Sequence, residues 1–177
     1  MLFVNFSGGY KYSVFVHFAS MESLNLPEYL FTISEKNGKQ YIFDEIRKKY
    51  LLLTPEEWVR QNFIKYLVVN KLYPASLLSL EKSFLQNKSN RRTDIVVMNS
   101  QGKPLMLVEC KASSVQLSQQ VFDQTASYNR EVNALILVVT NGLKHYCFRS
   151  NFEQRKWDFL SEIPTYLDLK SLWVEKL

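Results

Sequence analysis

The hydrophobic pattern of the chain alternates between the period of two that is typical of strands and the longer period of helices. Residues 29–43 predict a β-hairpin, because apolar runs flank Asn37-Gly38, a dipeptide that favours a tight turn. Residues 54–72 predict a helix, since Thr54 suits its N-cap and Pro55 its first position. One face of this helix is apolar and should be buried; its members are Val59, Phe63, Tyr66 and Leu67.

The remainder of the chain continues with strands and a second helix. Strands are predicted in residues 76–84, in the two apolar runs of residues 91–113, and in residues 133–140 and 143–149, and a helix in residues 118–129. The order is therefore helix, three strands, helix, two strands. Strands that are apolar on both sides need cover on both faces, so we expect an α/β fold with a mixed sheet flanked by helices on both faces. The pattern of residues 151–177 favours no element.

The composition is that of one folded domain. The 177 residues are enough for a full hydrophobic core, and 46% of them are hydrophobic, which excludes a disordered chain. No linker or internal repeat divides the sequence, so we expect a single domain over residues 21–177. Residues 1–20 lack the positive region and the continuous apolar stretch of a signal peptide. Met21 is an alternative start, which would make residues 1–20 an upstream extension outside the core.

Charge and cysteine content narrow the range of functions. The formal net charge of +5 weakly favours an anionic partner. No apolar run reaches the roughly 18 residues of a membrane span, so no membrane association is expected. Cys110 and Cys147 make no disulfide framework, which favours a reducing, cytoplasmic location. With only two histidines in the chain, a histidine-rich metal site is excluded.

Three charged residues interrupt the two apolar runs of residues 91–113: Asp94, Glu109 and Lys111. If Gln101-Gly102 forms the centre of the turn between the runs, Asp94 lies directly opposite Glu109, with Cβ atoms roughly 4.5–5.5 Å apart. Lys111, two residues beyond Glu109, points to the same face. Two carboxylates this close repel each other unless a cation lies between them, and oxygen ligands suit Mg²⁺. The spacing therefore predicts a metal site; the alternative is charges that are merely solvated at strand ends.

Four segments, in this order, resemble the PD-(D/E)XK nuclease superfamily, and most of all the nuclease domain at the N-terminus of type I restriction enzyme R (HsdR) subunits. They are TPEEWVRQNFIKYL, RRTDIVV, PLMLVECKA and VFDQTASYN, and the resemblance covers residues from about 45 to 150. It implies a restriction-endonuclease-like αβββαβ core and DNA cleavage that depends on Mg²⁺, for which Mn²⁺ is an expected substitute. Asp94 and the pair Glu109 and Lys111 match the catalytic motif. Thr93 stands where the superfamily has proline, at a position that carries no ligand.

The resemblance also implies an acidic residue on the first helix, where Glu56 and Glu57 are adjacent. Glu57 lies three residues after Thr54 and would form a capping box with it. Glu56 lies three residues before Val59 and shares the core-facing stripe. We therefore favour Glu56 for the site and Glu57 for the cap. The alternative is that both acids only complement the helix dipole.

Further matches concern contacts with nucleic acid. Gln124 and Tyr128 match the QxxxY motif that lies beside the catalytic core in RecB-like and type I nucleases, and at i and i+4 they share a helix face. The alternatives are a surface glutamine and a core tyrosine. We expect Lys88, Arg91 and Arg92 to contact phosphates, unless they form only a solvated basic loop.

With these residues, the resemblance implies a DNA endonuclease domain of a restriction or defence system. Asp94, Glu109 and the backbone carbonyl of Cys110 would hold Mg²⁺, Glu56 would complete the shell directly or through water, and Lys111 would offset charge on the phosphate. No G-x-x-x-x-G-K-[ST] loop is present, so a motor or specificity function would come from separate subunits. The alternatives are a nuclease of DNA repair or recombination, and a non-catalytic nucleic-acid-binding or assembly module on the same fold.

Overall fold

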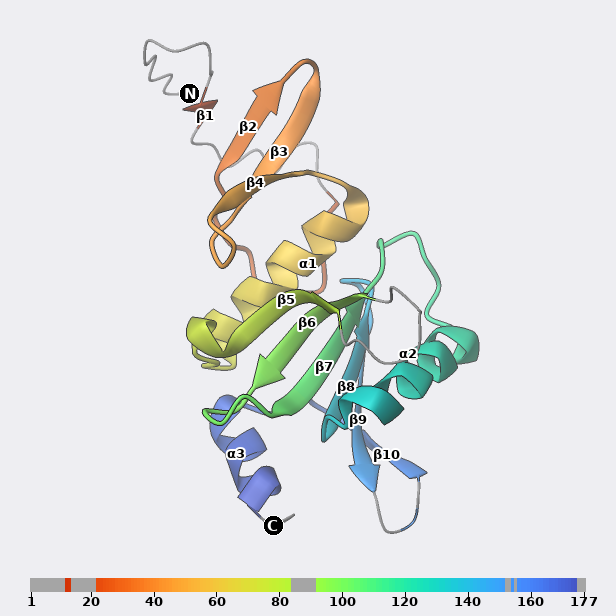
Figure 1. Ribbon diagram of the computed structural model, residues 1–177. Coiled ribbons are helices and arrows are strands. Elements are labelled where there is room, and N and C mark those ends of the chain that lie inside the picture. The colour runs from red at the N-terminus through yellow and green to blue at the C-terminus, as the bar shows by residue number, and fades with distance from the viewer. Residues whose placement is uncertain (1–11, 14–21, 84–91, 152–153, 155, 175–177) are drawn as a thin grey trace.

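The computed structural model describes residues 12–13, 22–83, 92–151, 154 and 156–174 (Figure 1). The small sheet consists of β1 (Tyr12–Ser13), β2 (Ile33–Lys36), β3 (Lys39–Asp44) and β4 (Lys49–Leu52). The large sheet consists of β5 (Leu78–Ser83), β6 (Arg92–Met98), β7 (Pro104–Cys110), β8 (Ile136–Thr140), β9 (His145–Asn151) and β10 (Lys156–Leu160). The helices are α1 (Pro55–Lys65), which a π-helical turn (Tyr66–Asn70) continues, a 3₁₀ turn (Ala75–Leu77), α2 (Gln119–Val132) and α3 (Tyr166–Val174).

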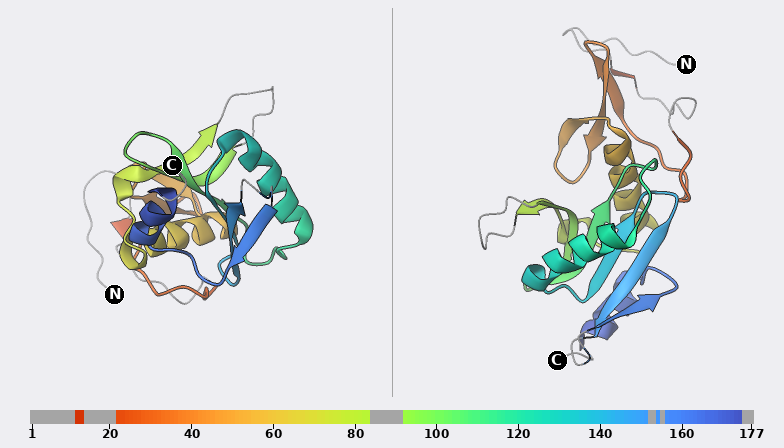
Figure 2. Two further views of the ribbon diagram at one scale, coloured as in Figure 1. Left: turned by 90° about the horizontal axis from the view of Figure 1, so that it is seen from below. Right: turned by 90° about the vertical axis from the view of Figure 1, so that its right-hand side faces the viewer.

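The large sheet is mixed, with the strand order β10-β9-β8-β7-β6-β5. β7 and β8 are parallel, whereas the other neighbouring strands are antiparallel. α1 and α3 pack on one face and α2 on the other, as Figures 1 and 2 show. The order of α1, β5, β6, β7, α2 and β8 is the expected αβββαβ core, and the prediction of helices on both faces is confirmed.

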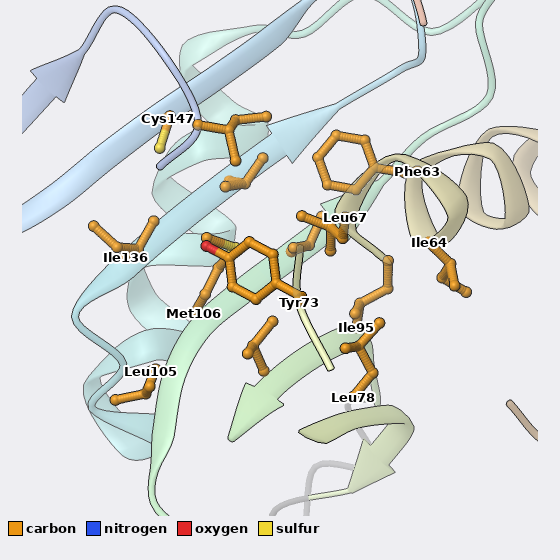
Figure 3. Close-up of a cluster of buried hydrophobic side chains, with 14 of the residues drawn as sticks. Phe63, Ile64, Leu67, Tyr73, Leu78, Ile95, Leu105, Met106, Ile136 and Cys147 are labelled. Atoms are coloured by element: carbon orange, nitrogen blue, oxygen red, sulfur yellow. The ribbon is translucent and has the colours of Figure 1, made fainter. Parts of the chain in front are cut away.

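The main core lies between α1 and the large sheet. Phe63 and Leu67 are fully buried in one cluster with Met106 of β7 (Figure 3). Burial of a side chain such as Phe63 stabilises the fold by about 1.5–3 kcal/mol. The predicted apolar stripe is therefore confirmed: Val59 is fully buried in the same cluster, and Tyr66 is half-buried against it.

A second, smaller core lies between α2 and the opposite face of the sheet. Tyr128 of α2 belongs to the same buried cluster as Leu107 of β7. Met106 and Val108, the neighbours of Leu107 along β7, belong to the main core instead. Because side chains alternate along a strand, Glu109 lies on the α2 face with Leu107.

The small sheet confirms the predicted hairpin, although its first strand begins at Ile33. Asn37 and Gly38 have positive φ angles of 54° and 70°, which a tight turn of the type I′ kind requires. β4 is too short to stand out in the hydrophobic pattern and is missed by it. β1 pairs with β2 from within residues 1–20, the predicted upstream extension; the other residues of that range lie outside the described ones.

The C-terminal part of the chain forms β10 and α3, for which the hydrophobic pattern gives no prediction. Thr165 and Asp168 cap α3 reciprocally: Asp168 Oδ2 accepts from the Thr165 N–H over 3.0 Å, and Thr165 Oγ1 accepts from the Asp168 N–H over 3.2 Å. Leu169 is fully buried in the main core, so α3 belongs to the fold. None of the described helices is long and apolar enough to cross a membrane.

Candidate active site

β6 and β7 form the hairpin that carries Asp94 and Glu109. Its ladder pairs Ile95 with Val108, Val96 with Leu107 and Val97 with Met106. Asp94 and Glu109 are the next residues beyond the ladder, so this register places them opposite each other where the strands end. Both lie on the α2 face, two residues along the strands from Val96 and Leu107 respectively.

The turn of this hairpin differs from the predicted two-residue turn. The Asn99 N–H donates to Lys103 O over 2.8 Å, and Asn99 Oδ1 accepts from the N–H groups of Gln101 and Lys103. Three residues, 100–102, therefore form the loop, and the prediction of its centre at Gln101-Gly102 is wrong. The ladder is irregular between the pairs Val97–Met106 and Met98–Pro104, where Leu105 is an extra residue on β7, and this returns the strands to the predicted register.

The Asp94 carboxyl group is contacted at both oxygens. Its Oδ2 accepts a hydrogen bond from the Cys110 N–H over 2.7 Å, and its Oδ1 lies 3.6 Å from Nη1 of Arg60. Burial and the charge of Glu109 raise the pKa of Asp94 to about 7; the Cys110 N–H and Arg60 act in the opposite direction, and Glu56 adds to the increase. The two carboxylates therefore repel each other electrostatically, and a bound cation would relieve this repulsion.

Glu109 and Lys111 form an ion pair at the C-terminal end of β7. Lys111 Nζ donates to Glu109 Oε1 over 2.6 Å. Burial lowers the pKa of Lys111, but the hydrogen bond and charge of Glu109, with smaller contributions from Glu56 and Asp94, outweigh it and raise this pKa above its ordinary value. The Lys111 N–H donates to Thr140 O of β8 over 2.8 Å, which fixes the backbone next to the ion pair.

Glu56 of α1 lies near these residues but does not join them in a three-carboxylate group. Its side chain is exposed, and its charge acts on the pKa values of both Asp94 and Lys111. In the part of the chain that the structure describes, no three His, Cys, Asp or Glu side chains are placed to hold a metal ion together. Direct ligation by Glu56 beside Asp94 and Glu109 is therefore not found, and its contact with a metal through water stays a prediction.

Glu57 has a buried carboxylate and does not complete the predicted capping box. Thr54 is the N-cap, as predicted, since its Oγ1 accepts from the Glu57 N–H over 3.1 Å. The Thr54 N–H, however, donates to Leu52 O, and the Glu57 carboxylate accepts from Gln61 Nε2 over 2.8 Å and from Arg60. The reciprocal half of the capping box is wrong, because Arg60 and Gln61, one turn further along the same helix, hold the Glu57 side chain.

Arg60 belongs to the candidate site although the sequence pattern does not single it out. Its guanidinium contacts Asp94 and Glu57, and its side chain is 12% exposed. The available signal was its position one helical turn after Glu56, which places both side chains on the same face of α1.

The two α2 residues of the predicted QxxxY motif have different environments. Gln124 is exposed, whereas Tyr128 is buried in the smaller core, as in the core-packing alternative. A contact of either residue with a DNA strand stays a prediction. The predicted phosphate contacts of Lys88, Arg91 and the Arg92 side chain fall outside the described residues.

The candidate donor atoms for a metal ion are oxygens. They come from the carboxylates of Asp94 and Glu109 and, by prediction, from the backbone carbonyl of Cys110. The Cys110 side chain is fully buried in the main core, on the opposite face, so its thiol is no ligand here. Mg²⁺ is commonly bound through one or two carboxylates and keeps several waters, so this donor set fits Mg²⁺ or Mn²⁺.

A family model, described as type I restriction enzyme R protein N terminus (HSDR_N), matches residues 55–164. The chain belongs to this family. The matched part of this HSDR_N member begins with α1 and includes Glu56, Asp94, Glu109 and Lys111, whereas β1 to β4 precede it. None of the curated proteins matches the chain.

Two solved structures are similar to this HSDR_N member. One is a fragment assigned to the HsdR subunit of a type I restriction enzyme from Vibrio vulnificus YJ016, with 17% identity, a TM-score of 0.46, and coverage of 66% of this chain and 25% of the other. The second is the type IIG restriction endonuclease BpuSI, with 21% identity, a TM-score of 0.45, and coverage of 67% of this chain and 15% of the other. The similarity thus spans only a quarter or less of these longer chains.

Proposed function

We propose that this HSDR_N domain is a Mg²⁺-dependent DNA endonuclease that hydrolyses phosphodiester bonds. The observation that carries the proposal is the register of the β6-β7 hairpin, whose last pair, Ile95 with Val108, puts Asp94 and Glu109 at the next opposed positions, and the charge of Glu109 also raises the pKa of Asp94. Membership of a restriction enzyme family supports DNA as the substrate.

The carboxylates of Asp94 and Glu109 would bind the cation, with the Cys110 carbonyl as a further oxygen ligand. A bound Mg²⁺ would polarise the scissile phosphate and lower the pKa of a nearby water. Asp94 is oriented for this role by the Cys110 N–H, and the end of β7 is anchored to β8 through Lys111. The hairpin therefore presents both ligands from rigid strands rather than from a loop.

Lys111 would act on the phosphate through its positive charge. Its Nζ donates to Glu109, so it would lie beside a cation bound by Glu109 and next to a phosphate oxygen at that cation. Fixed donors aimed at developing charge are worth about 10²–10³-fold in rate. Glu56, exposed on α1 nearby, would act through water.

Recognition of the target DNA would depend on partner subunits. No nucleotide-binding loop occurs in the sequence, so we propose that motor and specificity subunits of a type I restriction complex supply translocation and recognition. Contacts of this chain with DNA would involve phosphates, and binding should weaken steeply with salt.

The test is cleavage of covalently closed plasmid with Mg²⁺ by the purified protein and its variants. Asp94→Ala should abolish nicking, Lys111→Ala should slow it by about 10²–10³-fold, and EDTA should abolish nicking by the wild type. Asp123→Ala is the matched control, because Asp123 is an exposed carboxylate of α2 that accepts a hydrogen bond from Gln119 of the same helix. Equal nicking by all four proteins would show a contaminating nuclease and refute the assignment. A gel shift of DNA without nicking by the wild type would favour a non-catalytic binding module instead.

A further inference from the structure

Alternating charges link the small sheet to the candidate metal site. Arg47 Nε lies 2.6 Å from Asp44 Oδ2, and Arg47 Nη2 lies 3.6 Å from Glu57 Oε1. Arg60 then bridges Glu57 to Asp94, with 3.6 Å between its Nη1 and Asp94 Oδ1. We call these five residues, Asp44, Arg47, Glu57, Arg60 and Asp94, the ion chain.

The ion chain is largely withdrawn from water. The exposed fractions of its side chains are 0% for Asp44, 4% for Glu57, 13% for Arg47, 12% for Arg60 and 17% for Asp94. A buried ion pair gains little stability over well-packed apolar side chains, because desolvation of the charges offsets their attraction. Stability alone therefore explains these residues poorly, and their connection to Asp94 suggests what else they do.

Two donors from different elements hold the Asp94 carboxylate. The Cys110 N–H of β7 binds Oδ2, and Arg60 of α1 faces Oδ1. Arg60 is itself held by Glu57, whose carboxylate also accepts from Gln61 Nε2 over 2.8 Å. The orientation of Asp94 thus depends on a side chain that α1 fixes in place.

We propose that Arg60 is a positioning residue that holds the Asp94 carboxylate in the orientation that binds the divalent cation, and that the ion chain extends this support to the small sheet. The inference rests on the proposed function, since it takes Asp94 as a metal ligand. Side chains that orient metal ligands typically contribute 10–100-fold to metal affinity. The small sheet, which precedes the family-matched residues, would then support the catalytic unit through Asp44.

The sign of the effect separates positioning from simple electrostatics. Arg60 is a cation beside a cation site, so its charge alone weakens metal binding, and its removal would strengthen it. Loss of positioning has the opposite sign and weakens metal binding. A purely structural role of Arg60 would lower stability and leave the metal affinity of the folded protein unchanged.

The experiment measures Mn²⁺ affinity by isothermal titration calorimetry at one fixed, mildly alkaline pH, with thermal unfolding in EDTA as the check of folding. Arg60→Gln should weaken binding by about tenfold or more. Arg60→Lys keeps the charge but loses the planar fork that reaches both carboxylates, so it should also weaken binding. Lys65→Gln is the matched control: it removes a cation of the same helix that pairs with exposed Glu45 and lies outside the ion chain, and it should bind Mn²⁺ like the wild type.

A second comparison tests whether Glu57 acts on metal binding through Arg60. Glu57→Gln should weaken Mn²⁺ binding because Arg60 loses its anchor, and the double variant with Arg60→Gln should bind no more weakly than Arg60→Gln alone. Additive losses of affinity in the double variant would show that Glu57 does not act through Arg60. They would overturn the proposal that the ion chain supports Asp94.

The results distinguish a failure of this inference from a failure of the proposed function. Wild-type affinity in folded Arg60→Gln and Arg60→Lys, with binding lost in Asp94→Ala, would overturn the positioning role alone. Tighter binding by Arg60→Gln would overturn it as well, in favour of simple repulsion. A wild type that binds Mn²⁺ no better than Asp94→Ala would refute the metal site, and the positioning role with it.

Discussion

A methyl group added at Gly142 tests how closely Leu24 and Val59 pack against the turn between β8 and β9. Gly142 lies in the turn between β8 and β9 with a φ of +82°, and its carbonyl accepts from the Asn25 N–H over 2.8 Å. A Cβ atom at this position would lie 2.7 Å from Leu24 Cδ2 and 3.1 Å from Val59 Cγ2. Gly142→Ala should therefore introduce both backbone strain and overpacking.

The two contributions have different sizes and sources. The left-handed conformation costs an L-residue about 1–2 kcal/mol. Overpacking costs about 1–3 kcal/mol in general, and we expect about 1–2 kcal/mol here, because the half-buried Leu24 can shift whereas Val59 is fully buried. The total, about 2–4 kcal/mol, is a large share of the roughly 5–15 kcal/mol by which domains are stable.

Urea unfolding followed by circular dichroism measures this loss, and two other glycines provide the controls. Gly38 and Gly102 have φ angles of +70° and +73°, and a Cβ atom at either meets nothing within 4 Å. Gly38→Ala and Gly102→Ala should lose only the strain of about 1–2 kcal/mol. Adding Leu24→Ala to Gly142→Ala should relieve part of the overpacking. A loss in Gly142→Ala no larger than in Gly102→Ala would refute the close packing of Leu24 and Val59 on this turn.

Three further predictions concern pH, the main core and catalysis. His145 Nε2 lies 2.9 Å from Asn25 O, and burial lowers its pKa below 6.5 despite that carbonyl. The unfolded chain then takes up a proton near pH 6.5 that the folded protein does not, so the free energy of unfolding should decrease as the pH falls below 6.5, and chemical denaturation across pH should show a weaker dependence for His145→Gln. Phe63→Ala should lower the free energy of unfolding by about 3–5 kcal/mol in urea titrations, and a loss under 1 kcal/mol would contradict its place in the core. Lys111→Met should reduce the plasmid nicking rate by about 10²–10³-fold while far-UV circular dichroism stays unchanged; a rate within threefold of the wild type would argue against its charge acting on the phosphate.

The elements that local signals specify were predictable from the sequence. The hairpin at Asn37-Gly38, the N-cap at Thr54 and the apolar stripe around Phe63 are all found. These features depend on backbone conformation or periodicity within a few residues. β4 was missed because four residues are too few for a periodic signal, and α3 because its reciprocal Thr165 and Asp168 cap lies in a segment without clear periodicity.

The site was predictable where it depends on strand register and not where it depends on tertiary contacts. The ladder up to Ile95 and Val108 has the predicted register, because an extra residue in β7 compensates for the three-residue loop, and one residue further it places Asp94 opposite Glu109. The assignment of Glu57 to a capping box failed because Arg60 and Gln61 compete for its carboxylate. The ion pair of Arg60 with Asp94 joins residues far apart in the sequence and leaves no local pattern, which is why Arg60 entered the site only with the structure.

Anomalous diffraction from crystals soaked in Mn²⁺ tests the central claim most directly. One divalent ion should bind between Asp94 and Glu109, with an oxygen of each carboxylate at about 2.0–2.3 Å from a single anomalous peak. A peak that contacts neither carboxylate, or two carboxylates that turn away from each other with no ion between them, would contradict a shared metal site in this HSDR_N domain.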